Sequence, residues 1–361
     1  MKSWLMQRRD ILTSAGALAL LGVGSRVSGA EAATVMPGWR EFEITTRVTL
    51  EEAPGAAQLW LPLAQTAGGY QAATALRWQS SGASTVVRDD RYGAEILKTT
   101  WEPAAAGPKT IEVVQRVAAC DRQGATTGMP MTVAERGFWR QATESVPTDG
   151  IVRDTALRVI GDRTAPREKL RALYDWVVDN TSRDPEVPGC GFGDVRSMLE
   201  SGNLSGKCAD INGLMTGLAR AAGFAARDVY GIRVAPSTQF RTLGASGDIS
   251  KAQHCRTEVF LEEEGWLPLD PADVRKVVLE HRLPLDGAEV RALRERLFGG
   301  WEMNWVGYNS AMDIELPGAG AGRKPNFAFL MYPCAFTAAG QPDCLRPDQF
   351  RYEINAREIS A

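Results

Sequence analysis

A cysteine near the start of a predicted helix is the first residue that could act as a nucleophile. Residues 205–210 read Ser-Gly-Lys-Cys-Ala-Asp, and apolar residues follow at helical spacing. We expect a helix over residues 205–222, capped by Ser205, with Cys208 in its first turn. The free N–H groups and the dipole of a helix N-terminus stabilise a thiolate, and Lys207 adds positive charge. The pattern predicts a nucleophile, although a small buried core cysteine explains this feature alone equally well.

A histidine and an aspartate stand at the ends of a predicted hairpin. Only two histidines occur, His254 and His281. His254 precedes the alternating segment 256–261, and a Glu-Gly turn leads into a second strand that ends at Asp270. Pairing of the strands would place His254 beside Asp270, whose carboxylate would hold the imidazole in one tautomer as a general base. With Cys208 this is the layout of nucleophilic catalysis; the alternative is a core histidine near a surface aspartate.

Three blocks of the sequence resemble the core of transglutaminase-like proteins. They are Gly206-Lys207-Cys208, the segment 214–231 with its Leu-Ala-Arg-Ala-Ala-Gly-Phe run, and the segment 253–271 with Gln253-His254 and Gly265-Trp266-Leu267-Pro268-Leu269-Asp270-Pro271. The resemblance spans about residues 165–275 and implies a papain-like fold with a Cys–His–Asp triad. The triad maps onto Cys208, His254 and Asp270. The chain departs from the family where Ala225 replaces a frequent proline and Cys255-Arg256 replaces a common aromatic residue.

These roles imply acyl transfer on an amide bond of a peptide or protein substrate. Cys208 would attack the carbonyl to form a thioester, His254 would protonate the departing amine, and the backbone N–H of Cys208 would stabilise the oxyanion. We expect water to resolve the thioester, which makes the protein a peptidase or deamidase, because no amine-binding feature is visible. The alternatives are an amine-crosslinking transglutaminase and a non-catalytic binding or assembly protein with a partner in the cell envelope.

The elements that must position these residues predict an α+β protein. Short alternating segments with Gly and Pro breaks at 39–61, 84–87, 94–101 and 110–117 are typical of a β-sandwich. Helical spacing follows from residue 148, and strand-like segments return at 327–331 and 349–356. We expect an N-terminal β-rich domain at 31–130, a transglutaminase-like core at 131–290 and a β-rich C-terminal region at 291–361. The Gly-rich loop 189–194 is expected to line the catalytic cleft or to cap a short helix.

The first thirty residues have the pattern of an export signal. Arg8-Arg9 precedes an apolar run over residues 15–23, and the small residues Ser28-Gly29-Ala30 offer a cleavage site. The paired arginines favour twin-arginine transport over an ordinary Sec signal. No other segment approaches membrane-spanning length. We therefore expect a periplasmic or secreted protein that does not span the membrane.

Composition narrows the remaining function classes. The chain of 361 residues is 44% hydrophobic, enough for a sizeable core, and its net charge of −3 disfavours a nucleic-acid partner. With two histidines and no CxxC pair we expect neither a metal nor another cofactor. We expect Cys208 to be a free thiol. Cys334 and Cys344 flank a loop that a disulfide can close, while pairing with Cys120, Cys190 or Cys255 stays open.

Overall fold

The computed structural model describes residues 38–50, 55–104, 107–125, 130–320 and 323–360. The expected export signal therefore lies outside the described residues. No helix within the described ranges is long and apolar enough to cross a membrane.

The alternating segments of the first third form two antiparallel sheets. One sheet has the strand order β11-β17-β1-β6-β3, and the other has the order β16-β2-β5-β4. Their inward residues, including Phe42, Leu59 and Leu97, are fully buried in one common core, as expected for a sandwich-like pair. The strands are β1 (Trp39–Leu50), β2 (Ala57–Pro62), β3 (Gln71–Ser80), β4 (Ala83–Arg88), β5 (Glu95–Trp101), β6 (Lys109–Cys120), β11 (Gly247–Asp248), β16 (Cys334–Thr337) and β17 (Tyr352–Ser360).

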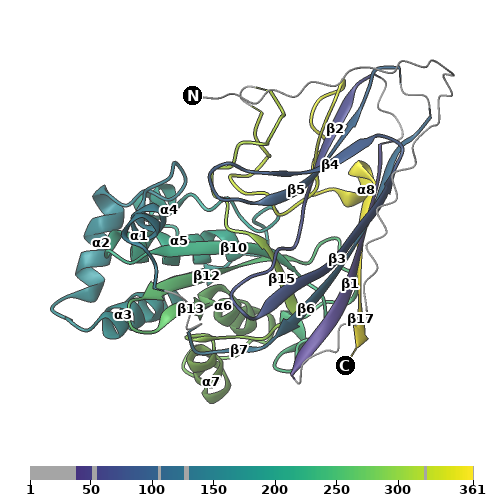
Figure 1. Ribbon diagram of the computed structural model, residues 1–361. Coiled ribbons are helices and arrows are strands. Elements are labelled where there is room, and N and C mark those ends of the chain that lie inside the picture. The colour runs from purple at the N-terminus through teal and green to yellow at the C-terminus, as the bar shows by residue number, and fades with distance from the viewer. Residues whose placement is uncertain (1–37, 51–54, 105–106, 126–129, 321–322, 361) are drawn as a thin grey trace, which may run out of the picture. The chain divides into compact units, whose positions relative to one another are not determined.

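Strands from the C-terminal part of the chain complete both sheets. β17 pairs with β1 in the register Ile44↔Ala356, and β16 pairs with β2 in the register Leu59↔Ala335. Figure 1 shows the yellow strand β17 running beside the purple strand β1. Segments that are far apart in the sequence therefore share a sheet.

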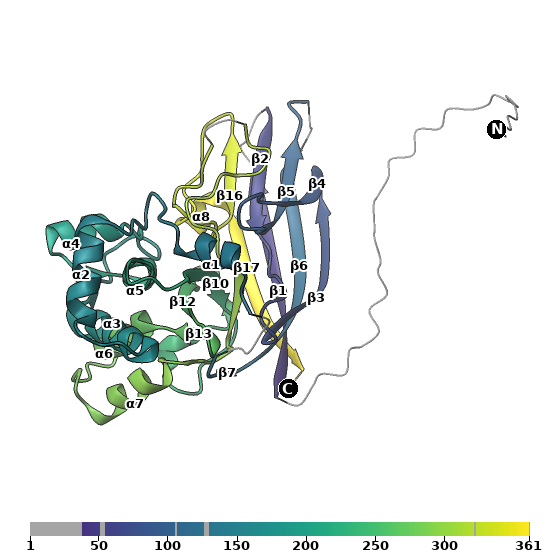
Figure 2. The ribbon, with the colours of Figure 1, turned by 60° about the vertical axis from the view of Figure 1, so that its left-hand side comes forward.

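A third sheet and a group of helices carry the predicted catalytic residues. The antiparallel order β13-β12-β10-β15 comprises β10 (Ala226–Arg233), β12 (Gln253–Leu261), β13 (Gly265–Leu269) and β15 (Trp305–Asn309). Helix α5 packs against β10 and β12, and Figure 2 shows α2, α3, α5 and α6 gathered on one side of this sheet. The helices are α1 (Val133–Arg140), α2 (Gly150–Ile160), α3 (Pro166–Asn180), α4 (Val195–Ser201), α5 (Cys208–Ala221), α6 (Pro271–Glu280), α7 (Ala288–Arg296) and α8 (Pro347–Phe350), with the 3-10 turn η1 (Arg241–Leu243).

Short strand pairs and one glutamine join the layers. β8 (Ser182–Arg183) pairs with β9 (Ser205–Gly206), and β7 (Arg122–Gln123) pairs with β14 (Gly300–Trp301). The buried amide of Gln71 on β3 donates to the carbonyl of Gly307 on β15 at 2.8 Å and accepts from its N–H at 2.8 Å. This side chain therefore hydrogen-bonds the sandwich to the sheet β13-β12-β10-β15.

The α+β class is confirmed, two local expectations are wrong, and one strand was not predicted. The predicted helix at 205–222 begins at Cys208, because Ser205 belongs to β9 and the Asp210 carboxylate, not the serine, accepts the Lys207 N–H at 2.9 Å. Residues 327–331 form no strand apart from an isolated bridge at Phe329. β3 was missed because most of its residues are exposed, so the apolar alternation that marks a half-buried strand is absent.

Candidate active site

Cys208 is the first residue of α5, and a carboxylate clamps the neighbouring loop against it. Asp210 Oδ1 accepts the N–H groups of Phe192 and Gly193, each at 2.9 Å, while Oδ2 accepts that of Lys207. Gly191, which precedes Phe192 in this loop, has φ +94°, and a Cβ there would lie 1.9 Å from Asp210 Oδ2. Only glycine permits this close approach.

The same arrangement leaves the helix N-terminus ready for an anion. Within the described residues, the backbone N–H of Cys208 has no hydrogen-bond acceptor, as expected for a first helical position. The next N–H, of Ala209, donates to the carbonyl of Cys190 at 2.8 Å. The free N–H of Cys208 can therefore donate to a ligand oxygen beside the sulfur.

Three buried thiols meet at this helix end. The thiols of Cys190 and Cys255, together with His254, hold the pKa of Cys208 well below the ordinary value, although burial opposes this. The Cys190 thiol also donates to the carbonyl of Gln253 at 3.3 Å, and the Cys208 sulfur lies 3.9 Å from the carbonyl of Cys190. The pKa values of Cys190 and Cys255 are raised well above theirs, because they donate and because they are buried. Cys208 is therefore the most easily ionised of the three thiols.

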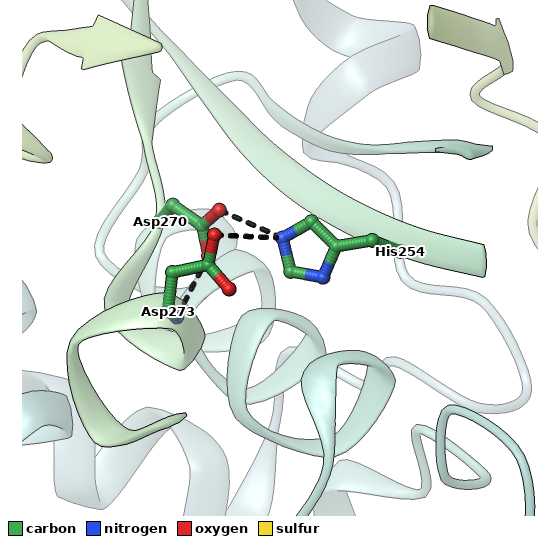
Figure 3. Close-up of side chains that lie close together, drawn as sticks. All are labelled: His254, Asp270 and Asp273. Carbon is green, nitrogen blue, oxygen red and sulfur yellow. Dashed lines mark hydrogen bonds and ion pairs between the residues drawn. The ribbon is translucent and has the colours of Figure 1, made fainter. Parts of the chain in front are cut away.

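His254, in β12, points one ring nitrogen at two carboxylates. Its Nε2 lies 2.8 Å from Asp270 Oδ2 and 3.5 Å from Asp273 Oδ2, as Figure 3 shows. The ring is only 3% exposed. Nδ1 makes no hydrogen bond to either of the two carboxylates drawn, and the imidazole helps to lower the pKa of the Cys208 thiol. Burial and the Arg233 guanidinium lower the pKa of His254, but Asp273 and Asp270 outweigh them, so its pKa is raised.

The two carboxylates are themselves held by buried donors. Arg233 Nη2 donates to Asp273 Oδ1 at 2.6 Å, and Arg256 Nε lies 3.4 Å from Asp270 Oδ2. Asn212, in α5, donates to Asp270 Oδ1 at 3.2 Å and to the carbonyl of Cys255 at 2.8 Å. Asn212 thus joins α5, which begins at Cys208, to strand β12 and to the Asp270 carboxylate that faces His254.

The pKa values of the two carboxylates are shifted in opposite directions. Burial and the nearby Asp273 raise the pKa of Asp270, although His254 and Arg256 favour its ionised form. Burial also acts on Asp273, but the Arg233 guanidinium and His254 lower its pKa well below the ordinary value. The pair therefore offers the imidazole one firmly ionised carboxylate and one closer hydrogen-bond acceptor.

His254, Asp270 and Asp273 also have the donor types of a metal site. Their nearest ligand atoms lie within 4.8 Å of one another. However, the guanidiniums of Arg233 and Arg256 already contact these carboxylates, so a divalent cation would meet two fixed positive charges. The electrostatics fit a protonated imidazole at this place better than a metal ion.

Cys208 and His254 line one pocket of about 410 Å³. Loop residues Gly189 and Cys190 form part of its wall, so the predicted cleft role of loop 189–194 is confirmed, and Asp194 also caps α4 by accepting the Ser197 N–H at 3.0 Å. The remaining lining residues are Arg183, Lys207, Arg233, Gly244, Ala245, Ser250, Lys251, Ala252, Gln253, Lys276, Tyr332, Leu345 and Tyr352.

The structure brings together the three residues that the sequence singled out and leaves the second histidine elsewhere. His281 ends α6, where its Nε2 lies 3.2 Å from Thr242 Oγ1 at an exposed position. Sequence reasoning missed Asp273, although an acidic residue three positions after the helix-capping Asp270 is a recognisable pattern. It also missed Arg256, Asn212 and the thiols beside Cys208, for which spacing carries no signal.

All six cysteines are free thiols, Cys208 among them as predicted. The disulfide considered between Cys334 and Cys344 is not formed. Burial raises the pKa of each of these two thiols to about 12. Their chemistry is therefore that of protonated, unreactive side chains.

Comparisons with known proteins agree with this arrangement. Residues 153–271 match the transglutaminase-like superfamily, a range that includes all three predicted catalytic residues. An uncharacterized protein of Haemophilus influenzae is 32% identical over 326 residues, which cover 84% of this chain and 87% of the relative.

Two solved structures overlap with this chain to different extents. The crystal structure of "a Putative Cysteine Protease from Cytophaga hutchinsonii" overlaps with a TM-score of 0.55 at 11% identity, covering 90% of this chain and 92% of that one. The periplasmic domain of TgpA from Pseudomonas aeruginosa overlaps with a TM-score of 0.34 at 15% identity, covering 67% and 93%. The first likeness shows a shared fold. On the match over residues 153–271, this chain contains a domain of the transglutaminase-like superfamily.

Proposed function

We propose that the protein is a thiol-dependent hydrolase of amide bonds, with Cys208, His254 and Asp270 as its catalytic triad. The observation that carries this proposal is the division of the His254 ring. Nε2 lies 2.8 Å from Asp270 Oδ2, Nδ1 makes no hydrogen bond to either carboxylate, and the imidazole helps to lower the pKa of the Cys208 thiol. A thiolate and an imidazolium in one pocket are the reactants that amide cleavage requires.

The reaction follows from these positions. The Cys208 thiolate attacks the amide carbonyl, and the oxyanion accepts the free backbone N–H of Cys208. As the tetrahedral intermediate collapses, the C–N bond breaks and His254 gives its proton to the leaving nitrogen. A water molecule, deprotonated by the now neutral imidazole, attacks the thioester, releases the acid and returns the thiolate and the imidazolium. Asp270 keeps the Nε2–H in place throughout.

The charge of the pocket supports hydrolysis over amine transfer. The side chains of Arg183, Lys207, Lys251 and Lys276 line it, and all are cationic. An amine acceptor is a cation at neutral pH, since the pKa of an ordinary lysine is about 10.4. Entry into this pocket would raise its energy by like-charge repulsion, whereas water is unaffected. We therefore propose a peptidase or deamidase acting on a peptide or protein.

The test is product analysis with a matched pair of cysteine variants. A library of glutamine-containing peptides is incubated with the protein, with and without a labelled amine, and read by mass spectrometry. Cleavage or deamidation should exceed amine incorporation, and Cys208→Ala should abolish both. Cys120→Ala, which changes a cysteine of β6 outside the pocket, should leave the rate unchanged.

Two outcomes would replace this proposal. Amine incorporation above both hydrolytic products would make the protein a crosslinking transglutaminase. An absence of any product, combined with tight binding to an envelope component that Cys208→Ala does not weaken, would indicate a non-catalytic binding protein.

We further propose that the protein works in the periplasm or outside the cell, after twin-arginine export. The support is the Arg8-Arg9 pair ahead of a modest apolar run. Replacing both arginines with lysine should retain the uncleaved precursor in the cytoplasm. Unchanged export would refute the twin-arginine route and favour Sec.

A further inference from the structure

The pocket beside Cys208 is lined by five cationic side chains and by no carboxylate. The cations are Arg183, Lys207, Arg233, Lys251 and Lys276. The chain as a whole carries a net charge of −3, so this concentration does not follow from composition. Cationic clusters next to a reactive group bind anions and raise their local concentration.

Nearby acidic groups neutralise only part of this charge. Asp273 pairs with Arg233 at 2.6 Å. Glu280 is shared, since its Oε1 lies 3.5 Å from Arg183 Nε and 4.0 Å from Lys276 Nζ.

The two remaining lysines of the lining have less compensation still. No carboxylate of the described residues lies within 4.0 Å of the ammonium groups of Lys207 or Lys251. Asp248 and Asp348 act on Lys251 from a greater distance, and Asp270 acts on Arg233 together with Asp273. All these carboxylates lie outside the lining of the pocket, so the surface that a ligand would meet is cationic.

Two of the cations come from chain segments next to Cys208. Arg183 of β8 pairs in register with Gly206 of β9, so it lies beside the chain segment that leads into Cys208. Lys207 is the next residue, and it caps the nucleophile helix. Both cations thus reach the pocket from the side of the chain that supplies the sulfur.

Lys276 enters the pocket from a different element, α6. Its side chain is only 18% exposed, and burial together with Arg233 lowers its pKa, although Asp273 and Glu280 oppose this. A lysine kept in this environment is costly to the fold, because its charge is partly desolvated and repelled by its neighbours. A bound anion would relieve that cost.

Resting on the proposed function, we propose that the substrate is an acidic peptide whose carboxylate, close to the scissile amide, is bound by Arg183, Lys207 and Lys276. A free α-carboxylate at the end of a peptide and the side chain of an acidic residue share this chemistry. The cations would hold the carboxylate while Cys208 attacks the neighbouring carbonyl, and the balance of the acyl-transfer reaction is unaltered.

The first experiment needs no known substrate. Cys208 is alkylated with iodoacetate, which is anionic, and with the neutral iodoacetamide. The rates are read from the tryptic peptide that spans residues 208–220 and contains no other cysteine. The ratio of the two rates removes the effect of the thiol pKa, which is common to both reagents. For a reference we use a neutral thiol, N-acetylcysteine amide.

We expect the iodoacetate-to-iodoacetamide ratio at Cys208 to exceed the reference ratio by about tenfold or more, and to fall at high salt. Lys276→Gln and Arg183→Gln should each lower it about threefold to tenfold, as for the loss of one unit charge in a partly solvated pocket. Lys276→Arg, which retains the charge, should keep it. Lys324→Gln, a control outside the pocket, should leave it unchanged.

The second experiment uses paired peptides that differ only in a carboxylate or its carboxamide. We expect kcat/KM to favour the carboxylate, and Lys276→Gln to reduce this preference mainly through KM. A ratio at Cys208 no higher than the reference, or one that Lys276→Gln and Arg183→Gln leave unchanged, would overturn the anion site. A high iodoacetate-to-iodoacetamide ratio at Cys208 without turnover of any peptide would support the anion site and refute the proposed hydrolase. Turnover of peptides without a preference for the carboxylate would support the hydrolase and refute the anion site.

Discussion

Replacing Asp270 with asparagine should switch the tautomer of His254 and abolish the Cys208 thiolate. Asp270 Oδ1 accepts the Asn212 amide at 3.2 Å and the Asp273 N–H at 3.1 Å, so an asparagine here must keep its oxygen on that side. Its NH₂ group then faces His254 Nε2, where Oδ2 accepted at 2.8 Å. Nε2 must lose its proton to accept, and Nδ1 becomes protonated and unable to take the thiol proton.

The size of the effect is set by the thiol that remains. An ordinary cysteine, with a pKa of about 8.5, is only about 0.3% ionised at about pH 6. The pKa of the native Cys208 is held well below the ordinary value, which favours the thiolate there. The thiolate fraction should therefore fall by up to about 300-fold at about pH 6 and by little at about pH 9. Hydrogen bonds from Cys190 and Cys255 persist, so the loss should be smaller than this limit.

The assay is the ultraviolet absorbance of the thiolate against pH, taken as the difference between each protein and its Cys208→Ala counterpart. Absorbance reports ionisation without the change in intrinsic reactivity that accompanies a change in thiol pKa. Asp273→Asn is the matched control, because it removes a nearby charge but leaves the hydrogen bond between His254 Nε2 and Asp270 Oδ2. It should keep the thiolate at about pH 6, where an ordinary thiol is not ionised.

The control also carries a pH prediction of its own. Asp273 raises the pKa of His254, so Asp273→Asn should lower it. The imidazolium would then be lost at a lower pH, and the alkaline limb of the rate profile should move down. Retention of most of the Cys208 thiolate in Asp270→Asn at about pH 6 would refute the tautomer argument, and a greater loss in Asp273→Asn would exchange the roles of the two carboxylates.

Three further changes test how the site is supported. Glu258→Gln should lower the free energy of unfolding in urea by about 3–5 kcal/mol, because Glu258 is 1% exposed and its loss leaves the Arg122 guanidinium buried without that carboxylate. Since the pKa of Glu258 is lowered in the folded protein, this stability is present above about pH 4.3 and is lost as pH falls. If the stability of the variant depended on pH as steeply as that of the wild type, the prediction would be contradicted. Gly191→Ala should displace the loop from Asp210 and slow Cys208 alkylation, and an unchanged rate would show that the loop does not support the thiolate. Asn212→Ala should destabilise the fold by about 1–3 kcal/mol, measured in the same urea assay, because buried partners of its amide lose their hydrogen bonds; a free energy of unfolding equal to the wild type would argue against this role.

The pattern of residues along the chain determined the α+β class and the elements that hold the reactive groups. A cysteine at a helix start and a histidine and an aspartate at the ends of a hairpin are local features, because capping and strand alternation depend on near neighbours. Cys208, His254 and Asp270 could therefore be singled out before any contact between them was known. The spacing of Asp273 after Asp270 carried the same kind of information.

Only the tertiary structure decided what surrounds these residues. Arg233 reaches Asp273 across 40 positions of the sequence, and Arg183 reaches Glu280 across a longer separation that no periodicity reveals. The thiol of Cys190 approaches Cys208 because the Asp210 carboxylate clamps a glycine loop. The charge of the pocket and the pKa values of the thiol and the imidazole are sums over such long-range neighbours, so they arise only when the chain is folded.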